Sequence, residues 1–200
     1  MTVVLGLIKN NQVWLSADTR IVADTSIVDS SHGSKLIKLK DCVVGFAGNV
    51  MFREYFELYC HERLAQEPNE SIFNGFTSRL DVMKVFIAYW AFVKDNHARI
   101  FGDDEQGYTA LVATPNTLYE VDSDNTITEL SNFGAIGSGG VVASGVMDYL
   151  LGRDERPEVI LEEAHNVACK YDSACGGSQE IINVTRLTSG KRKYTRKTRD

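Results

Sequence analysis

The stretch TVVLGLIKNNQVWLSADTR, residues 2–20, carries the pattern that decides the fold. It holds two β-rich segments, Val3–Ile8 and Val13–Ala17, with the polar residues NNQ between them. Valine and isoleucine favour extended backbone, and asparagine is a common turn residue. The stretch therefore predicts two strands joined by a turn, at the start of a sheet.

Further β-rich segments follow directly, at Ile21–Val28, Lys35–Leu39 and Val43–Phe46. The pattern then becomes helical. Asn49 can cap a helix whose aromatic residues Phe52, Phe56 and Tyr59 recur at helical spacing, and a second periodic run covers about residues 76–93. The first half of the chain therefore predicts a block of strands followed by two helices.

Strands return in the second half, at Tyr108–Ala113, Leu118–Val121, Thr126–Leu130 and Phe133–Ile136. The glycine-rich GSGG then introduces a helical stretch to Leu151, and Pro157 suits the first turn of a helix running towards Tyr171. A last strand is expected over Ser178–Leu187. Two blocks of strands, each followed by two helices, imply two packed sheets with helices outside them. We expect an α+β fold, a four-layer αββα sandwich.

The composition fits one globular domain. With 200 residues, of which 44% are hydrophobic, the chain can bury one core. We expect a single domain over residues 1–190 and a basic tail over 191–200. No stretch approaches the ~20 apolar residues of a membrane span, and the N-terminus lacks a signal-peptide pattern, so we expect a cytoplasmic protein. The four cysteines and four histidines show no metal-ligand or disulfide spacing, so no metal site is expected.

The net charge of −6 hides an asymmetry. The last ten residues, KRKYTRKTRD, hold six basic residues and one acidic residue, which leaves −11 for residues 1–190. An acidic body argues against general nucleic-acid binding, because phosphate contacts need a basic surface. The tail fits a solvated terminus, with docking to an acidic partner as the alternative.

Five short motifs occur in order along the chain: residues 2–20, GSKLIKL, VVGFAGN, AIGSGG and YDSACGGS. This ordered series resembles the proteasome β-subunit family and its bacterial relative HslV, over about residues 2–187. The resemblance implies the fold of the N-terminal nucleophile hydrolases and the activity of a threonine peptidase. FAGN and AIGSGG look like HslV, whereas ADTR and DSACGG look like proteasome β subunits, so six-fold and seven-fold rings both remain open.

In that family the nucleophile is the N-terminal threonine of the mature chain, and the matching residue here is Thr2. Met1 must be removed first, and initiator-methionine trimming favours a small second side chain such as that of threonine. Removal frees the α-amine, whose reference pKa of ~8 lets it accept the hydroxyl proton. Without the motifs around it, Thr2 at the start of a strand suits a structural role.

Three more residues match the family's catalytic positions. A Lys35 ammonium beside Thr2 would favour a deprotonated amine and a developing alkoxide, and Asp18 would orient that lysine. Taken singly, Asp18 suits a turn or cap, and Lys35 suits a solvated side chain. Gly48 matches the glycine whose backbone N–H helps to form the oxyanion hole, and it also suits the residues that lead into a helix.

Ser138, Asp172 and Cys175 match the polar groups that support the terminal amine in the family. The family commonly has serine where this chain has Cys175, and a thiol is a weaker hydrogen-bond partner than a hydroxyl. Cys175 could instead act as a nucleophile. The sequence suggests no histidine partner for it, however, and a lone buried cysteine is usually inert.

The resemblance also implies that Ile21, Phe46, Gly48 and Asn49 contact the substrate. Phe46 falls where the family places the floor of the pocket for the side chain that precedes the cut. A bulky floor shortens a pocket, so we expect a preference for small or medium apolar side chains there.

The expected function is that of a threonine endopeptidase that hydrolyses peptide bonds of unfolded proteins through an acyl-enzyme, without a cofactor. The resemblance further implies a homo-oligomeric ring or stacked double ring and an ATP-dependent unfoldase, with neither nucleic acid nor membrane as a partner. One alternative is a small-molecule amidase of the N-terminal nucleophile superfamily. Another is a non-catalytic ring subunit, which Cys175 favours and which the set Thr2, Asp18 and Lys35 disfavours.

Overall fold

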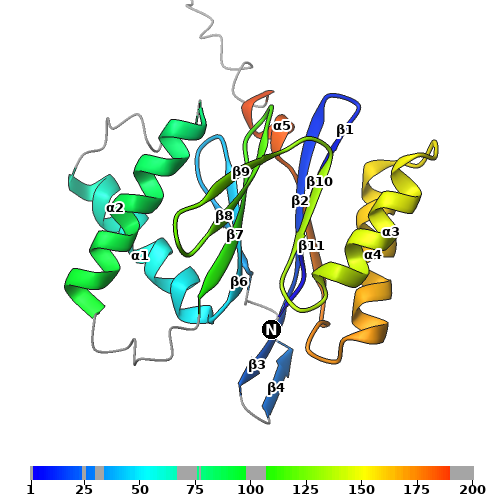
Figure 1. Ribbon diagram of the computed structural model, residues 1–200, viewed down its shortest axis with the longest axis horizontal. Helices are drawn as coiled ribbons and strands as arrows, with labels where there is room; N and C mark the ends of the chain where they lie inside the picture. Colours follow the sequence, from blue (N-terminus) through cyan, green and yellow to red (C-terminus); the bar gives the residue numbers. More distant parts are fainter. Residues whose placement is uncertain are drawn as a thin grey trace, which may run out of the picture.

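The structure, a computed structural model, describes residues 2–23, 26–29, 34–66, 76, 78–97 and 107–189. Met1 and the basic tail over 191–200 lie outside the described residues. Two antiparallel sheets face each other, and a pair of helices covers the outer face of each (Figure 1). The expected α+β sandwich of four layers is confirmed. In the part of the chain described, no helix combines the length and the apolar character needed to cross a bilayer.

The first sheet has the strand order β10-β1-β2-β11. Its strands are β1 (Val4–Lys9), β2 (Gln12–Asp18), β10 (Phe133–Ile136) and β11 (Gln179–Asn183). The β1–β2 hairpin turns at Asn10 and Asn11, whose φ values are 54° and 56°. Two consecutive positive φ values match the right-handed twist of the strands, and asparagine tolerates them better than most residues. The turn predicted at this point is therefore confirmed.

The second sheet has five strands that lie in their order along the chain. They are β5 (Leu36–Lys38), β6 (Val43–Gly48), β7 (Tyr108–Ala113), β8 (Leu118–Asp122) and β9 (Ile127–Leu130). Every pair in it is antiparallel. Two helices separate β6 from β7 in the sequence, and the remaining pairs are hairpin neighbours.

The single strand expected over Ile21–Val28 is wrong. The segment forms two short antiparallel strands, β3 (Arg20–Ala23) and β4 (Ser26–Asp29), which pair with each other and with neither large sheet. The polar residues Asp24 and Thr25 interrupt the apolar run between them. Polar residues between two apolar runs are a hairpin signal, and it outweighs the β propensity of the segment as a whole.

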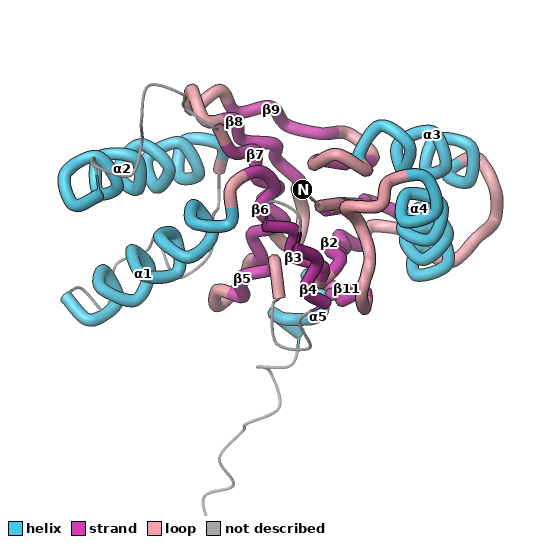
Figure 2. The backbone as a smooth tube through the Cα atoms, turned by 90° about the horizontal axis from the view of Figure 1, so that it is seen from below, coloured by secondary structure: helices cyan, strands magenta, loops and turns pink. Residues whose placement is uncertain are grey.

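Each sheet carries two helices on its outer face (Figure 2). They are α1 (Val50–Gln66) and α2 (Arg79–His97) on the second sheet, and α3 (Gly140–Leu151) and α4 (Pro157–Tyr171) on the first. The predicted cap of α1 is confirmed, since Asn49 Oδ1 accepts the backbone N–H of Met51 at 3.0 Å. The second helix starts later than Phe76 because Ser78 caps it, its Oγ accepting the N–H of Asp81 at 3.3 Å.

The last predicted strand is too long. It ends at Asn183, and residues Val184–Ser189 form a short helix, α5. Asn183 Oδ1 accepts the N–H of Arg186 at 3.1 Å, which is the hydrogen bond of a helix cap. Thr185 Oγ1 accepts the N–H of Val13 at 2.9 Å and so replaces the strand partner that β2 would otherwise lack.

The core has three parts, one in each space between layers. An aromatic cluster lies under α1 and α2, and an aliphatic cluster lies under α3 and α4. Between the sheets, two glycines allow close approach. A Cβ on Gly6 would lie 2.6 Å from Leu118 Cδ2, and a Cβ on Gly45 would lie 2.6 Å from Val4 Cγ1. A side chain at either position would require a neighbouring side chain to move, so glycine here favours close packing of the two sheets.

Candidate active site

Thr2 and Asp18 meet because of the β1–β2 register. Val4 lies opposite Ala17, so the chain just before β1 reaches the end of β2. Thr2 is 3% exposed, and the Asp18 side chain is fully buried. The Thr2 hydroxyl donates a short hydrogen bond to Asp18 Oδ1, and the backbone N–H of Val3 donates to the same oxygen at 3.0 Å. The hairpin thus fixes the hydroxyl and the carboxylate relative to each other.

Lys35 reaches the pair from the other sheet. It immediately precedes β5, and its carbonyl oxygen accepts the N–H of Phe46 in β6. Its Nζ lies 2.6 Å from Asp18 Oδ1 and 2.5 Å from Thr2 Oγ1. Burial lowers the pKa of Lys35, and the neighbouring Asp18 opposes that shift. A cation, a carboxylate and a hydroxyl therefore meet in one contact where the two sheets come together.

The AIGSGG motif holds the main chain of Thr2. The N–H of Gly139 donates to the carbonyl oxygen of Thr2 at 3.3 Å. Gly137 has a φ of 89°, and a Cβ there would lie 2.2 Å from that same oxygen. A side chain at Gly137 would therefore push Thr2 away. A Cβ on Gly139 would instead lie 2.7 Å from Cys175 Sγ, so this glycine allows the motif to approach Cys175.

A second polar group forms at the end of α4. Asp172 Oδ1 accepts the N–H of Ala174 at 2.9 Å, and Cys175 Sγ donates to Asp172 Oδ2 at 3.3 Å. Partial burial raises the pKa of Asp172, but hydrogen bonds from Ser138, Ala174 and Cys175 outweigh it and lower the pKa overall. Burial, together with Asp172, raises the pKa of Cys175 to about 12. The thiol therefore stays neutral and acts as a hydrogen-bond donor.

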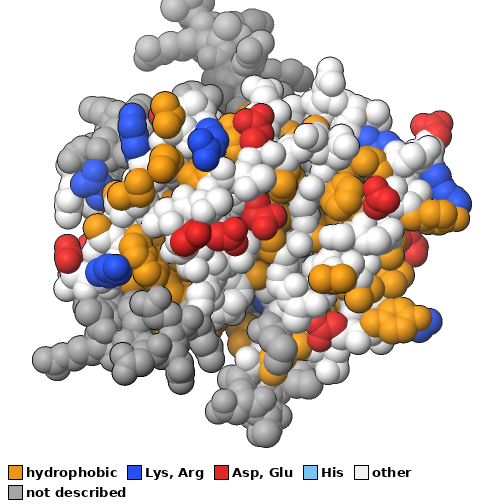
Figure 3. All heavy atoms as spheres, viewed as in Figure 1, with side chains coloured by type: hydrophobic (Ala, Val, Ile, Leu, Met, Phe, Trp, Pro, Cys, Tyr) orange, Lys and Arg blue, Asp and Glu red, His pale blue; other side chains and the backbone are white. Residues whose placement is uncertain are grey.

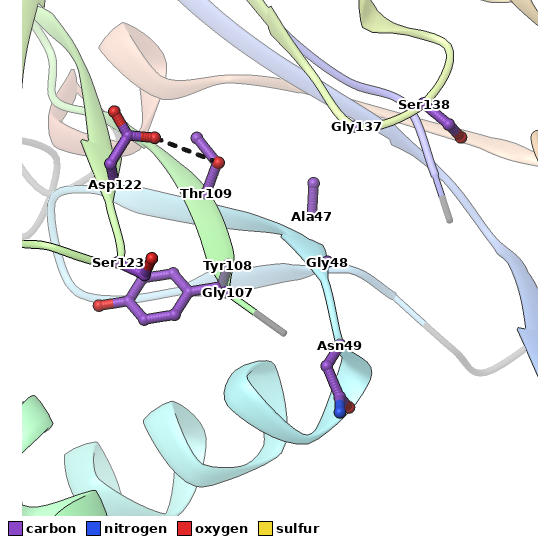
Figure 4. A pocket seen from close by; sticks show the side chains of 10 residues that line it. All are labelled: Ala47, Gly48, Asn49, Gly107, Tyr108, Thr109, Asp122, Ser123, Gly137 and Ser138. Carbon is purple, nitrogen blue, oxygen red and sulfur yellow. Dashed lines mark hydrogen bonds between the residues drawn. The ribbon is translucent and has the colours of Figure 1, made fainter. Parts of the chain in front are cut away.

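A cavity of about 590 Å³ opens beside these groups (Figure 4). Its lining comes from the end of β6, from β7 and β8, and from the segment before α3: Ala47, Gly48, Asn49, Gly107, Tyr108, Thr109, Asp122, Ser123, Gly137 and Ser138. Gly48 has a φ of 106°, and a Cβ there would lie 2.5 Å from the carbonyl oxygen of Gly107. The cavity thus lies between Gly48 and the glycine segment that contacts Thr2.

The chain is similar in structure to proteins that were solved earlier. It superimposes on a protein called BPH from Thiobacillus denitrificans, solved in complex with epoxomicin, with a TM-score of 0.73 and 19% identity, covering 91% of this chain and 98% of that one. It also superimposes on HslV from Trypanosoma brucei, with a TM-score of 0.67 and 20% identity, covering 90% of this chain and 97% of that one. The chain has their fold. No protein-family profile and no curated protein sequence matches it.

Within this HslV-like fold, the seven residues assigned to catalysis from the sequence lie around one centre. Thr2, Asp18 and Lys35 are in direct contact, and Gly48 lines the adjoining cavity. Ser138 lines the same cavity and also hydrogen-bonds to Asp172, which in turn bonds Cys175. In the described part of the chain, no group of three or more histidine, cysteine or acidic side chains is arranged to hold a metal ion.

The residues assigned to substrate binding are less closely grouped. Asn49 lines the cavity and also caps α1. Phe46 is 4% exposed and does not line the cavity itself. Its ring centroid lies 5.6 Å from that of Tyr108, and Tyr108 does line the cavity. Ile21 is half-buried in β3 and is not part of the lining. The role of Phe46 as the floor of the substrate pocket stays a prediction.

Sequence reasoning missed several groups at the site. The N–H of Gly176 donates to Asp18 Oδ2 at 3.0 Å, so both carboxylate oxygens are occupied. The far wall of the cavity comes from β7 and β8, where Thr109 Oγ1 donates to Asp122 Oδ1 at 3.2 Å. The sequence contains these groups, in the glycine pair of YDSACGGS and in the polar residues that end β8. The sequence does not show, however, that the glycine pair contacts Asp18 or that the end of β8 contacts β7.

Proposed function

We propose that this chain is an N-terminal threonine peptidase, with Thr2 as its nucleophile once Met1 has been removed. The observation that carries the proposal is the contact of Thr2 Oγ1 with Lys35 Nζ, at 2.5 Å, beside the fully buried carboxylate of Asp18. Buried charged groups in direct contact with a hydroxyl are typical of catalytic sites. The ordered motifs and the likeness to a protein solved with epoxomicin support the same reading.

The reaction begins with the hydroxyl of Thr2. Its Oγ attacks the substrate carbonyl carbon, and its proton passes to the free α-amine of the same residue. Lys35 stabilises the developing alkoxide, and the N–H of Gly48 stabilises the oxyanion. The C–N bond then breaks, the amine hands its proton to the leaving nitrogen, and an ester on Thr2 remains. Water activated by the same amine hydrolyses this ester to a carboxylic acid and regenerates Thr2.

The Asp172 group supports the amine in this scheme. A carboxylate whose pKa is lowered is ionised at neutral pH and can accept an N–H of the amine. Ser138 and Cys175 both bond to Asp172 and hold it in place. Because the pKa of Cys175 is raised to about 12, the thiol contributes as a donor and not as a nucleophile.

We further propose that unfolded polypeptide is the substrate and that the chain works in a homo-oligomeric ring in the cytoplasm, served by an ATP-dependent unfoldase. Figure 3 shows apolar side chains at the surface of both helical layers. Among the large exposed ones are Leu80 (61%) and Ile87 (49%) on α2, and Val141 (86%) and Tyr149 (63%) on α3. Single exposed apolar side chains are common on protein surfaces, so the proposal of a ring rests on the family resemblance of the ordered motifs. Light scattering at micromolar concentration tests the ring, and a monomer there would exclude it.

The decisive experiment combines intact-mass measurement with an epoxyketone such as epoxomicin, whose adduct requires both a hydroxyl and a free α-amine. We expect loss of the Met1 mass and a single adduct. Thr2→Ala should abolish peptide turnover and adduct formation, whereas Thr2→Ser should keep part of both. Thr128→Ala, at an exposed position on β9, is the matched control and should behave like the wild type.

An uncleavable N-terminal extension should also abolish turnover, because the amine becomes an amide and loses its basicity. Turnover by Thr2→Ala, or full activity with the extension, would exclude Thr2 as the nucleophile. Comparing peptides with small amides separates the peptidase from an amidase of the same superfamily. Absence of both reactions in the wild type would leave a non-catalytic subunit.

A further inference from the structure

The loop between α4 and β11, residues 172–178, supplies groups to both halves of the site. Asp172 and Cys175 belong to the amine side, whereas the N–H of Gly176 bonds Asp18 on the hydroxyl side. We propose that Arg20 is a positioning residue that fixes this loop and thereby sets how the two halves stand relative to each other.

The Arg20 side chain ties the loop together. Its Nη1 donates to the carbonyl oxygen of Ser173 at 3.0 Å and to that of Cys175 at 3.1 Å. One of these carbonyls belongs to Cys175 itself and the other lies two residues before it. One guanidinium nitrogen therefore holds two points of the loop from outside, and each bond gains strength from the positive charge.

The backbone next to Arg20 continues the same attachment. The N–H of Arg20 donates to the carbonyl oxygen of Gly176 at 3.1 Å, and that of Thr19 donates to Ser178 at 3.0 Å. In return, the N–H of Ser178 donates to Thr19 Oγ1 at 2.9 Å. Residues 18–20 and 176–178 are thus joined side by side, with the Asp18–Gly176 bond at one end.

The packing around Gly176 shows how closely the guanidinium lies on the loop. A Cβ at this position would stand 2.5 Å from Arg20 Cζ, so the guanidinium occupies the space a side chain would need. Movement of Arg20 would release Gly176, whose N–H bonds Asp18, and with it Cys175, which bonds Asp172. The contacts of Arg20 with the carbonyls of Ser173 and Cys175 are the ones through which it would act on the site.

Arg20→Lys is the informative variant. It keeps the positive charge, but the lysine side chain is one atom shorter and its ammonium cannot reach both carbonyls as the guanidinium does. We expect faster hydrogen exchange at the Gly176 amide, by ~10-fold, because a charge-assisted attachment is lost. We also expect kcat to fall ~10-fold with KM nearly unchanged, because a displaced group affects the transition state more than ground-state binding.

The pH profile separates positioning from general weakening. In the proposed mechanism Asp172 accepts an N–H of the Thr2 amine, which favours the charged form of that amine and raises its pKa. Asp18 and Lys35 also face Thr2, the first favouring the charged amine and the second opposing it, and Arg20→Lys changes the charge of neither. If the loop moves away, the pKa of the amine falls, and the acidic limb of kcat/KM shifts to lower pH. Because Arg20→Lys conserves charge, the shift reports geometry alone. Arg79→Lys is the matched control, since Arg79 Nε donates to the carbonyl of Ile127 at 3.0 Å, outside the site.

The kinetic part rests on the proposed function, but the exchange measurement does not. Unchanged exchange at Gly176 in Arg20→Lys overturns the attachment, whether or not the wild type cleaves peptides. Faster exchange with unchanged kcat and pH profile overturns the positioning role. A wild type without turnover would refute the proposed function and not the attachment. Should Arg20→Lys fail to fold, Arg20→Gln, whose neutral amide can still donate to one carbonyl, replaces it, and the exchange at Gly176 and the change in kcat are then the two readouts.

Discussion

Replacing Lys35 with methionine removes the cation from a fully buried carboxylate while keeping most of the side-chain volume. The carboxylate of Asp18 has no exposed surface, and Lys35 is 11% exposed. Removal of one partner from a buried pair costs about 3–5 kcal/mol, because the remaining charge has lost its compensation. Asp18 keeps hydrogen bonds from Thr2, Val3 and Gly176, so we expect the lower end, ~3 kcal/mol.

The assay is urea unfolding followed by circular dichroism at one fixed protein concentration, because association would otherwise shift the apparent stability. In a thermal melt of the same samples, ~3 kcal/mol corresponds to a fall in Tm of ~6–12 °C for a domain of this size. Lys38→Met, three residues further along and at the end of β5, is the matched control. The Lys38–Glu180 pair, at 2.8 Å, has exposed fractions of 57% and 27%, and such pairs contribute at most ~1 kcal/mol. If Lys35→Met costs no more than Lys38→Met, the reasoning from burial is refuted.

Three further predictions follow from single positions. Gly48→Ala should lower stability by ~1–3 kcal/mol and reduce turnover, because its φ of 106° and the nearby carbonyl oxygen leave no room for a Cβ; an unchanged melting temperature would contradict this. Burial lowers the pKa of His165, so the unfolded chain binds the proton more readily and stability should decline as the pH drops below ~6.5. The urea midpoint between pH 7.5 and 5 measures this, and His165→Gln should flatten the decline whereas the exposed His61→Gln should not. Cys175→Ser keeps a neutral donor and should retain or increase turnover, whereas loss of activity in that variant would mean that the thiol itself is required.

Much of the fold was predictable because the alternation between apolar and polar residues follows the elements closely. The β1–β2 hairpin, both pairs of helices and the order of blocks were all predicted from periodicity and turn residues. The errors lie where a short polar interruption or a cap decides the outcome. The segment expected as one strand forms β3 and β4, and Asn183 ends β11 by capping α5. The hydrogen bond of such a cap competes with strand propensity, and propensity alone does not predict which of the two wins.

The candidate site could be assembled only in part. Motifs that match a family in order identify Thr2, Asp18 and Lys35 without any knowledge of register. The wall from β7 and β8 could not be found in this way, because Thr109 and Asp122 become neighbours through strand pairing. The orientation of Phe46 is a further case. Alternation along β6 places it on the same face as Val44, but only the structure shows that this face lies against α1 and α2.

The contact of Thr2 and Asp18 with Lys35 joins the two sheets, so the packing between the sheets also affects the candidate site. Thr2 and Asp18 belong to one sheet and Lys35 to the other, so the spacing of the sheets determines a hydrogen-bond length at their rim. Gly45 lies opposite Leu36, next to Lys35, and against Val4, close to Thr2. A methyl group on Gly45 would press on Val4 and Leu36, and we expect it to lengthen the contact between the Thr2 hydroxyl and the Lys35 ammonium. A larger side chain between the sheets would therefore change two things at once, the packing of the core and the distance between Thr2 and Lys35.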